Sequence, residues 1–482
     1  MQASVPANST SSDRKTLLVL LLLYFVVYVI LALCSQGTYE TGDSINHYLI
    51  SHFSFIHPKL FLHHWGKPFF TLISSPFSQF GFIGIKVFNI LCGGIAIYCA
   101  YRICSILSLD NRFLIFAFIL FSPVYTQCLL SGLTEPFFSA ILMSAIYLYF
   151  SERFFLGTFL FSLLPFIRTE GFILLPIPVL YLIFQRRFYL PAFVLASTIA
   201  YSLIGYFFFK DFLWIIHQNP YRGAEDVYGR GGMLHFIKHY NSIWGLPIFL
   251  CFTLGILSEL LFFRRTKHES MQSLSLKKYF MYSLFFIYLI AHMIFWWKGL
   301  FGSIGAVRVI AAVLPISAVL SLEGYNFLVK HLSKKVFRFA PILLLTIFVI
   351  WFAIFKIVPV ELSTEEKVIK ETSEWVAQAK LDKNKMYYFY PWISVLLNRD
   401  IFDNRFNDEP WGLNDTTYVK NMPSGSILLW DSHFSANEGK ISKESILANH
   451  NFTLLKHFQS DQLWTDLNKT KKYFEVYVFQ KL

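Results

Sequence analysis

Residues 17–34 read LLVLLLLYFVVYVILALC, an unbroken run of apolar and aromatic side chains near the length that a helix needs to cross a bilayer. Arg14 and Lys15 come directly before this run. The residues after it, SQGTYE at 35–40, offer no small-residue cleavage site. We therefore expect a retained transmembrane helix here and not a removed signal peptide.

The composition of the whole chain extends this pattern. Hydrophobic residues make up 55% of the 482 positions, charged residues only 15%, and the mean hydropathy is +0.49. Similar apolar runs recur up to residue 358 and predict about eleven membrane spans. The chain is therefore predicted to be a polytopic α-helical membrane protein. The expected spans lie at 17–34, 81–100, 113–130, 136–150, 154–166, 171–184, 189–209, 246–263, 279–297, 304–321 and 339–358.

The last part of the chain differs in composition. Residues 359–482 are rich in Lys, Asp, Glu and Asn, contain no cysteine, and alternate short strand-like runs with polar turns. We expect a cytoplasmic tail at 1–16, a transmembrane domain at 17–358 with a long first outer loop at 35–67, and a small C-terminal α/β soluble domain at 359–482. Within that domain, strands are expected at 385–390, 426–430, 452–458 and 473–480, and a helix at 392–398.

The net charge of +12 follows the predicted topology. Basic residues such as Arg102, Arg187 and Lys278 collect in alternate loops, which the positive-inside rule places in the cytoplasm. We therefore expect membrane lipids, and no nucleic acid, as partners of these charges. An odd number of spans puts the C-terminal domain outside. A bacterial inner membrane with a periplasmic domain is favoured, and the endoplasmic reticulum is the alternative.

Ionisable residues that interrupt the apolar runs fall on the predicted outer side. Such groups are costly at membrane depth unless they are paired or face a cavity. Each one alone also fits the end of a span, but together they indicate a water-accessible site at the outer leaflet. These residues are Glu40, Asp43, Glu135, Arg168, Glu170, Lys298 and Arg308.

Asp43 is the leading catalytic candidate. It follows Gly42, which permits a tight turn, in the long first outer loop. A carboxylate presented there can take a proton from an attacking hydroxyl. A second sound role is to cap the helix expected to start at Ser44, and the two roles are compatible.

Glu135, Arg168 and Glu170 are expected to contribute to the same cavity. Glu135 stands before Pro136, where the start of a helix also explains it. Arg168 and Glu170 lie between two short apolar runs that we count as two spans. A single span there would invert the topology of everything that follows.

Two late basic residues are candidates for binding a lipid phosphate. Arg308 lies just inside an apolar run, where a cation suits a phosphate group. Lys298 follows Trp297, and reaching the lipid headgroups beside an aromatic belt explains it equally well.

Five histidines crowd the first outer loop. None is paired with another at i, i+4, the spacing that puts two imidazoles on one helical face, and no cysteine accompanies them. We expect contacts with the interface or a substrate, with His47 and His64 as cavity candidates, and assign no metal ligands. A divalent metal stays the alternative. The five are His47, His52, His57, His63 and His64.

The run Asp431-Ser432-His433 follows an expected strand of the C-terminal domain. Its composition is that of a catalytic triad, but adjacent residues do not generally reach the geometry of a nucleophile and its base. We expect a structural turn or a turn that contacts the acceptor.

Together these motifs resemble the GT-C superfamily of membrane glycosyltransferases, over nearly the whole chain. The pattern is similar to the branch of the protein O-mannosyltransferases and lipid A aminoarabinose transferases. It departs from the mannosyltransferases because Ser44, and not a glutamate, follows the acid of the first loop. The residues that carry the resemblance are Asp43, Thr134-Glu135-Pro136, Arg168-Thr169-Glu170-Gly171, Arg308 and Pro315.

The resemblance implies an inverting enzyme that moves a sugar from a polyprenyl-phosphate donor to an acceptor hydroxyl at the outer membrane face. It implies Asp43 as the base and Arg308 at the lipid phosphate, with Glu135 and Arg168 in the cavity. It does not say whether the acceptor is a glycan, a lipid or a protein. A membrane transporter or flippase for a lipid-linked or sugar substrate is the alternative, although the two halves of the chain lack the convincing internal repeat that transporters usually carry.

Overall fold

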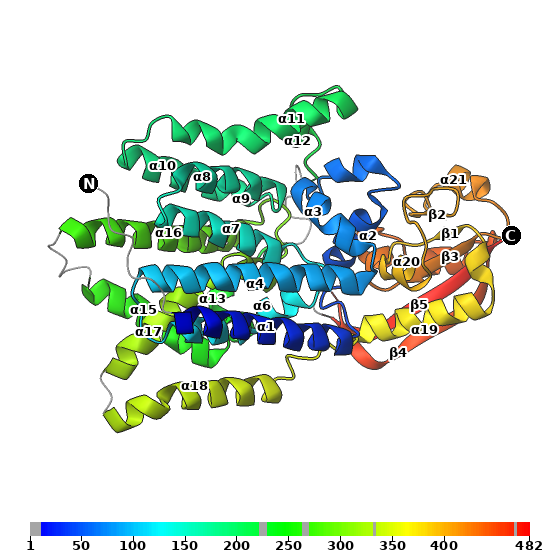
Figure 1. The fold of residues 1–482 in the computed structure, drawn as a ribbon. Coiled ribbons are helices and arrows are strands. Elements are labelled where there is room, and N and C mark those ends of the chain that lie inside the picture. The colour runs from blue at the N-terminus through cyan, green and yellow to red at the C-terminus, as the bar shows by residue number, and fades with distance from the viewer. Residues whose placement is uncertain (1–10, 221–228, 263–268, 331–333, 467–469) are drawn as a thin grey trace.

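The protein is described by a computed structural model that covers residues 11–220, 229–262, 269–330, 334–466 and 470–482. A bundle of helices makes up most of the molecule, and a mixed α/β domain lies at one end of it (Figure 1). That end is the one at which the first helix, α1 (Ser11–Cys34), finishes.

Four described helices are long and apolar enough to cross a membrane. On α1, apolar side chains such as Leu18, which is 69% exposed, and Leu22 point away from the rest of the protein. Surface of this kind is stable where lipid covers it. The four spans are Ser12–Cys34 in α1, Phe82–Ile106 (α4), Leu190–Phe209 (η4, Leu190–Leu195, and α11, Ala196–Phe209) and Ser275–Lys298 in α16 (Glu269–Lys298).

The span predicted at 113–130 is not one straight helix. Two helical segments, Arg112–Leu120 and Pro123–Leu129, meet there at an angle of 76°. Pro123 lacks an N–H and keeps the residue before it out of the helical region, so Ser122 is extended, with ψ 115°. The predicted span at 113–130 therefore corresponds to a bent pair of helices, which is either a broken span or a re-entrant loop. The segments are η2 (Arg112–Leu114), α5 (Ile115–Leu120) and α6 (Pro123–Leu129).

The other predicted spans coincide with shorter or interrupted apolar helices. By length and composition, the described residues hold four spans, or five if the bent pair is counted as one. The shorter helices are α7 (Glu135–Phe150), α8 (Phe154–Leu163), η3 (Leu164–Phe166), α9 (Gly171–Leu174), α10 (Pro176–Phe184), α15 (Leu246–Phe262), η5 (Val307–Ala312), α17 (Leu314–Lys330) and α18 (Lys334–Ile354). Three single-turn helices, α12 (Trp214–His217), α13 (His235–Lys238) and α14 (Tyr240–Ile243), lie between α11 and α15.

The first outer loop is largely helical. It contains α2 (Asp43–Phe53) and η1 (Pro58–Leu62), and α3 (Pro68–Ser78), which the sequence analysis did not predict, follows directly. Helix α2 begins at Asp43, with Gly42 before it, and the N-terminal N–H groups are not capped by Asp43. Instead, the two carboxylate oxygens of Glu40 accept the N–H groups of Gly42 (3.0 Å) and Ser44 (2.8 Å). The capping role considered for Asp43 therefore belongs to Glu40, and the Asp43 carboxylate is left for other contacts.

The C-terminal domain is built on a five-stranded sheet in the order β2-β1-β3-β5-β4. Strand β1 is parallel to β2 and β3, and β5 is antiparallel to β3 and β4. All four predicted strands have a counterpart here, whereas the helix α19 (Thr364–Gln378) was not predicted. The remaining elements are η6 (Leu381–Lys383), β1 (Met386–Tyr387), α20 (Trp392–Leu396), β2 (Asn407–Asp408), α21 (Thr416–Asn421), β3 (Ile427–Asp431), the π-helical turn η7 (Phe434–Glu438), α22 (Lys443–Leu447), β4 (Phe452–Thr465) and β5 (Lys471–Lys481).

Hydrogen bonds join the C-terminal domain to the start of the first outer loop. The Glu366 side chain accepts the N–H (2.9 Å) and the hydroxyl (2.6 Å) of Thr38. The same carboxylate accepts the N–H of Ser363 and so closes the capping box that begins α19. In addition, the N–H of Gly37 donates to the carbonyl of Val360 (3.0 Å). These contacts fix the backbone that leads to Asp43.

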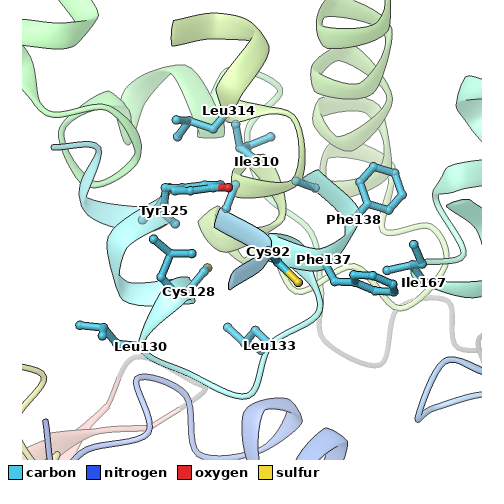
Figure 2. Packing of buried hydrophobic residues seen from close by; sticks show 14 of the residues in the cluster. Cys92, Tyr125, Cys128, Leu130, Leu133, Phe137, Phe138, Ile167, Ile310 and Leu314 are labelled. Carbon is cyan, nitrogen blue, oxygen red and sulfur yellow. The ribbon is translucent and has the colours of Figure 1, made fainter. Parts of the chain in front are cut away.

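A packed apolar core holds the elements that carry the charged candidates. Cys128 of α6, Phe137 of α7 and Ile310 of η5 are buried together with Leu133 and Ile167 (Figure 2). Four of these core residues lie within two positions of Glu135, Arg168 or Arg308, and the fifth, Cys128, lies on the neighbouring helix α6. A core packed at the density of a protein interior allows little movement of the residues attached to it, so it fixes the positions of Glu135, Arg168 and Arg308.

Candidate active site

A cavity of about 530 Å³ lies where the helical bundle meets the C-terminal domain. Its volume falls within the range typical of small-molecule sites. One part of the wall is apolar and comes from α16, η5 and the segment between them, with Phe295, Phe301, Ile304 and Val309. The other part is polar, with side chains from α2, the segment before α9, the C-terminal domain, and Arg308 of η5. The cavity therefore suits a ligand with an apolar and a polar end.

Asp43 and Arg308 meet in this cavity although they are far apart in the sequence. Arg308 Nη2 lies 2.5 Å from Asp43 Oδ2. Asp43 is presented by the first turn of α2, and Arg308 by η5, where the chain is already packed into the core. The predicted base and the predicted phosphate-binding residue thus form an ion pair.

A chain of alternating charges continues from Arg308 into the bundle. Arg308 Nη1 lies 4.0 Å from Glu135 Oε1, and Arg168 Nη1 lies 2.7 Å from the same oxygen. Arg168 Nη2 then contacts Glu170 Oε1 at 2.8 Å, and His292 Nε2 follows at 4.0 Å from Glu170. The Glu135 side chain is 0% exposed and lies behind the cavity wall between the two arginines. Glu135 therefore holds both guanidinium groups in place.

Two more residues of the first outer region reach the cavity. Lys67 is buried and donates from Nζ to the hydroxyl of Thr169 (3.2 Å). His47 is buried on the inner face of α2, and its Nδ1 has no hydrogen-bond partner among the described residues. Burial lowers the pKa of His47 to about 3, so its ring is neutral at ordinary pH. An unpaired ring nitrogen at a cavity wall is a ready contact for a ligand hydroxyl.

The pKa values of the two carboxyl groups near the start of α2, Glu40 and Asp43, are shifted in opposite directions. Burial raises the pKa of Glu40, and the positive charge of Arg308 offsets this increase only in part. Burial acts in the same direction on Asp43, but the guanidinium of Arg308 outweighs it and holds the pKa of Asp43 below its usual value. Asp43 is therefore the more acidic of the two carboxyl groups.

The structure brings together most, but not all, of the predicted site residues. Asp43, His47, Arg168, Glu170 and Arg308 line the cavity, and Glu135 lies directly behind it. Among the described residues, neither Lys298 nor His64 belongs to its wall. Lys298 is exposed and lies over the ring of Trp297, 3.9 Å from the centroid, which matches the alternative given for it. His64 lines a separate small pocket beside Trp214.

The histidines of the first loop are dispersed. His57 Nε2 lies 2.7 Å from Asp400 of the C-terminal domain, and His52 contacts the carbonyl of Ser78. Within the described ranges, no group of three or more His, Cys, Asp or Glu side chains is arranged to hold a metal ion.

The sequence analysis overlooked three ionisable residues of the cavity wall. Lys67 stands at the edge of the predicted loop, and its φ of +63° marks a strained position that the sequence does not reveal. His292 lies within an apolar run, and a single ionisable residue inside a span is itself a signal of function. Glu438 ends η7, just after the turn Asp431-Ser432-His433, for which contact with the acceptor was one of the two expectations, but Glu438 itself was not singled out.

The overall arrangement of the chain resembles that of a solved structure. No protein-family model matches the sequence, and no curated protein gives a significant match. The structure, however, is similar to the crystal structure of ArnT from Cupriavidus metallidurans bound to undecaprenyl phosphate, with a TM-score of 0.62 over 98% of each chain. The chain has the GT-C fold of ArnT.

The sequences of the two proteins are only 9% identical, so the likeness to ArnT concerns the fold. The fold and the long apolar helices together identify an integral membrane protein. The ArnT-like helical membrane fold implied by the motifs of the sequence is therefore confirmed, whereas the count of eleven spans stays a prediction.

Proposed function

We propose that this protein is a membrane glycosyltransferase that uses a polyprenyl-phosphate-linked sugar as donor and transfers the sugar to an acceptor hydroxyl with inversion. The observation that carries the proposal is the pairing of Asp43 with Arg308 at the junction of the polar and apolar walls of one cavity. The ArnT-like fold and the undecaprenyl phosphate bound to ArnT support the choice of donor.

The donor phosphate binds at the cationic side of the cavity. Arg308 supplies a planar guanidinium that matches a phosphate group, and Lys67 adds a second cation in the same wall. The prenyl chain extends along the apolar wall of Phe295, Phe301 and Ile304. During transfer, the bond between the anomeric carbon and the phosphate oxygen breaks, and the arginine stabilises the charge that develops on the leaving phosphate.

Asp43 acts as the base on the opposite side of the sugar. Its carboxylate accepts the proton of the acceptor hydroxyl while that oxygen forms the new bond to the anomeric carbon. The donor phosphate competes with Asp43 for Arg308, so binding of the donor frees the carboxylate. Loss of the guanidinium also removes the influence that lowers the pKa of Asp43, which makes the carboxylate a stronger base.

The topology belongs to the same proposal. All of the shorter apolar helices cross the membrane, which gives eleven spans, and the basic loops face the cytoplasm. Residues 359–482 then form a domain on the outer side, residues 1–16 stay in the cytoplasm, and the bacterial inner membrane is the location. Short spans are tolerated where neighbouring helices shield them, as they do for the core-packed α7.

Purified protein incubated with a panel of polyprenyl-phosphate-linked sugars tests the function directly. We expect release of free polyprenyl phosphate from at least one donor, measured by chromatography of the lipid products. Movement of intact lipid-linked sugar between leaflets of a vesicle without any release would instead identify the transporter or flippase. A donor panel that yields no release would refute the glycosyltransferase.

A further inference from the structure

The C-terminal domain contributes a wall of the cavity that the proposed reaction has not used. His433, Phe434 and Glu438 line it, from the turn that follows β3. This turn is held by Asp431, whose Oδ1 accepts the N–H groups of His433 (2.9 Å) and Phe434 (2.6 Å). A turn fixed in this way presents its side chains in one orientation, as a binding wall requires.

His433 is oriented by a second carboxylate. Its Nδ1 lies 2.8 Å from Glu365 Oε2. Glu365 in turn accepts the indole N–H of Trp464 (2.6 Å) and the hydroxyl of Tyr390 (3.2 Å), so it has little freedom to move. With Nδ1–H donated to Glu365, Nε2 is the ring nitrogen left for a ligand in the cavity. Burial disfavours the charged ring, but Glu365 outweighs burial and raises the pKa of His433.

The wall faces the turn that presents the proposed base. A Cβ atom added to Gly42 would lie 3.5 Å from Cζ of Phe434, so that ring packs directly on the residue before Asp43. The ring of His433 stacks on Phe434, with centroids 4.3 Å apart. A molecule bound against His433 therefore lies on the Asp43 side of the cavity, opposite the apolar wall assigned to the donor chain.

The chemistry of this side fits a ring that carries several hydroxyl groups. Asn46, Glu40 and Glu438 line it together with His433 and supply hydrogen-bonding groups of both kinds, while Trp65 offers an aromatic surface. Polar groups spaced around an aromatic surface are what a sugar ring needs, whereas a peptide or an acyl chain would leave several of them unpaired.

We propose that His433, positioned by Glu365, is an acceptor-binding residue, and that the acceptor is a glycan. One sugar hydroxyl lies at Asp43 and is glycosylated, and a neighbouring hydroxyl of the same glycan donates a hydrogen bond to Nε2 of His433. This assignment rests on the proposed glycosyltransferase function. It leaves open whether the glycan is free or is the headgroup of a glycolipid, since both present the same hydroxyl groups.

The test measures transfer by the purified full-length protein from the polyprenyl-phosphate sugar that the wild type cleaves best. Three acceptors are compared: lipopolysaccharide in detergent micelles, the oligosaccharide released from it by mild acid, and a peptide containing serine and threonine. We expect transfer to one or both of the carbohydrate acceptors, and the first two arms distinguish a glycolipid from a free glycan. Transfer to the peptide alone would overturn the proposal.

Variants of His433 and Glu365 then test whether His433 binds the acceptor. His433→Gln and Glu365→Gln should each raise the KM for the glycan about ten-fold or more, with a smaller change in the KM for the donor. The matched control is His457→Gln, because His457 also pairs with a glutamate of this domain, Glu475, at 3.2 Å, but does not line the cavity. Its KM for both substrates should equal that of the wild type.

Thermal unfolding of each variant separates loss of binding from loss of folding. If both variants fold and keep the wild-type KM for the glycan, the assignment of His433 is refuted while the glycosyltransferase stands. If instead the donor KM rises and the glycan KM does not, His433 belongs to the donor site and the proposal is equally refuted. A wild-type protein that releases no polyprenyl phosphate would remove the proposed function and this inference together.

Discussion

Two clusters of buried charge, built from similar residues, differ in what surrounds them. The outer charge cluster surrounds the cavity and consists of Asp43, Glu135, Arg168, Glu170 and Arg308. The closed charge cluster lies near the other end of the bundle and consists of Glu259, Lys278, Tyr282 and Glu323. Both obey the rule that charges inside a membrane protein are paired.

The closed charge cluster joins three helices, and none of its residues lines the cavity of about 530 Å³. Lys278 Nζ lies 2.6 Å from a carboxylate oxygen of Glu259 and 2.6 Å from one of Glu323, and the Tyr282 hydroxyl donates to Glu323 at 2.5 Å. Beside it, a Cβ on Gly324 would lie 1.9 Å from the carbonyl oxygen of Cys251, so α15 and α17 are in close backbone contact. This cluster ties helices together, whereas members of the outer charge cluster are exposed to a cavity. Pairing alone is therefore no sign of catalysis, and access to a cavity separates the two roles.

The largest expected effect comes from the outer charge cluster. Asp43→Asn keeps the size of the side chain but removes the base, and it should lower kcat for transfer by about 10²–10⁴-fold. The measurement is the initial rate of polyprenyl phosphate release at saturating donor and acceptor, with membrane insertion checked by gel filtration. A rate within two-fold of the wild type would exclude Asp43 as the base.

Arg308→Lys should have the next largest effect. Lysine keeps the positive charge but loses the planar guanidinium that contacts Asp43 and the donor phosphate, so kcat/KM for the donor should fall by about 10²-fold. The dependence of the transfer rate on donor concentration measures this fall in kcat/KM. The KM for the acceptor serves as internal control, and a variant with wild-type donor dependence would show that the phosphate binds elsewhere.

For the closed charge cluster, we expect a loss of stability without a loss of chemistry. Lys278→Met leaves two carboxylates without their cation and should destabilise the protein by about 3–5 kcal/mol. A lower Tm in detergent, at an unchanged kcat per folded molecule, is the expected result. Lys277→Met is the control, because its partner Glu152 is largely exposed and such pairs contribute little. A loss of kcat in Lys278→Met at full stability would contradict the structural role.

The smallest effect is expected where the first outer loop contacts the C-terminal domain. The pair of His57 and Asp400 is partly exposed, with 33% and 22% of the side chains accessible. Asp400→Asn should therefore lower stability by less than about 1 kcal/mol and leave transfer unchanged. Thermal unfolding measures the change in stability, and an assay of sugar transfer measures the rate. A large drop in rate would mean that this contact, and not the hydrogen bonds of Glu366, positions α2.

The comparison also indicates which features the sequence could predict. The outer charge cluster was predicted because its members break apolar runs on one side of the predicted membrane, and that pattern depends only on local composition and topology. The contact of Asp43 with Arg308, 265 positions away, could not be predicted, because nothing in either segment specifies the partner. Lys298 has the same kind of neighbours as Arg308 in the sequence, and only the packing of η5 separates the two.

Other misses had signals in the sequence. Ser363 and Glu366 have the spacing of a capping box and mark the start of α19. Pro123 marks the break in the span predicted at 113–130. The helix α3 carries Pro76 in its interior and several serines, and these residues concealed its helical character. Tertiary packing overrides local preference in such a segment.

The hydrogen bonds from Thr38 to Glu366 join residues that lie 328 positions apart. A ribosome delivers α1 to the membrane long before it has made residue 366. Throughout that interval the segment leading to Asp43 lacks the partner that fixes it, however well the first helices have inserted. Assembly of the cavity is thus one of the last events of biogenesis, and a chain arrested before α19 is anchored in the membrane without a finished site.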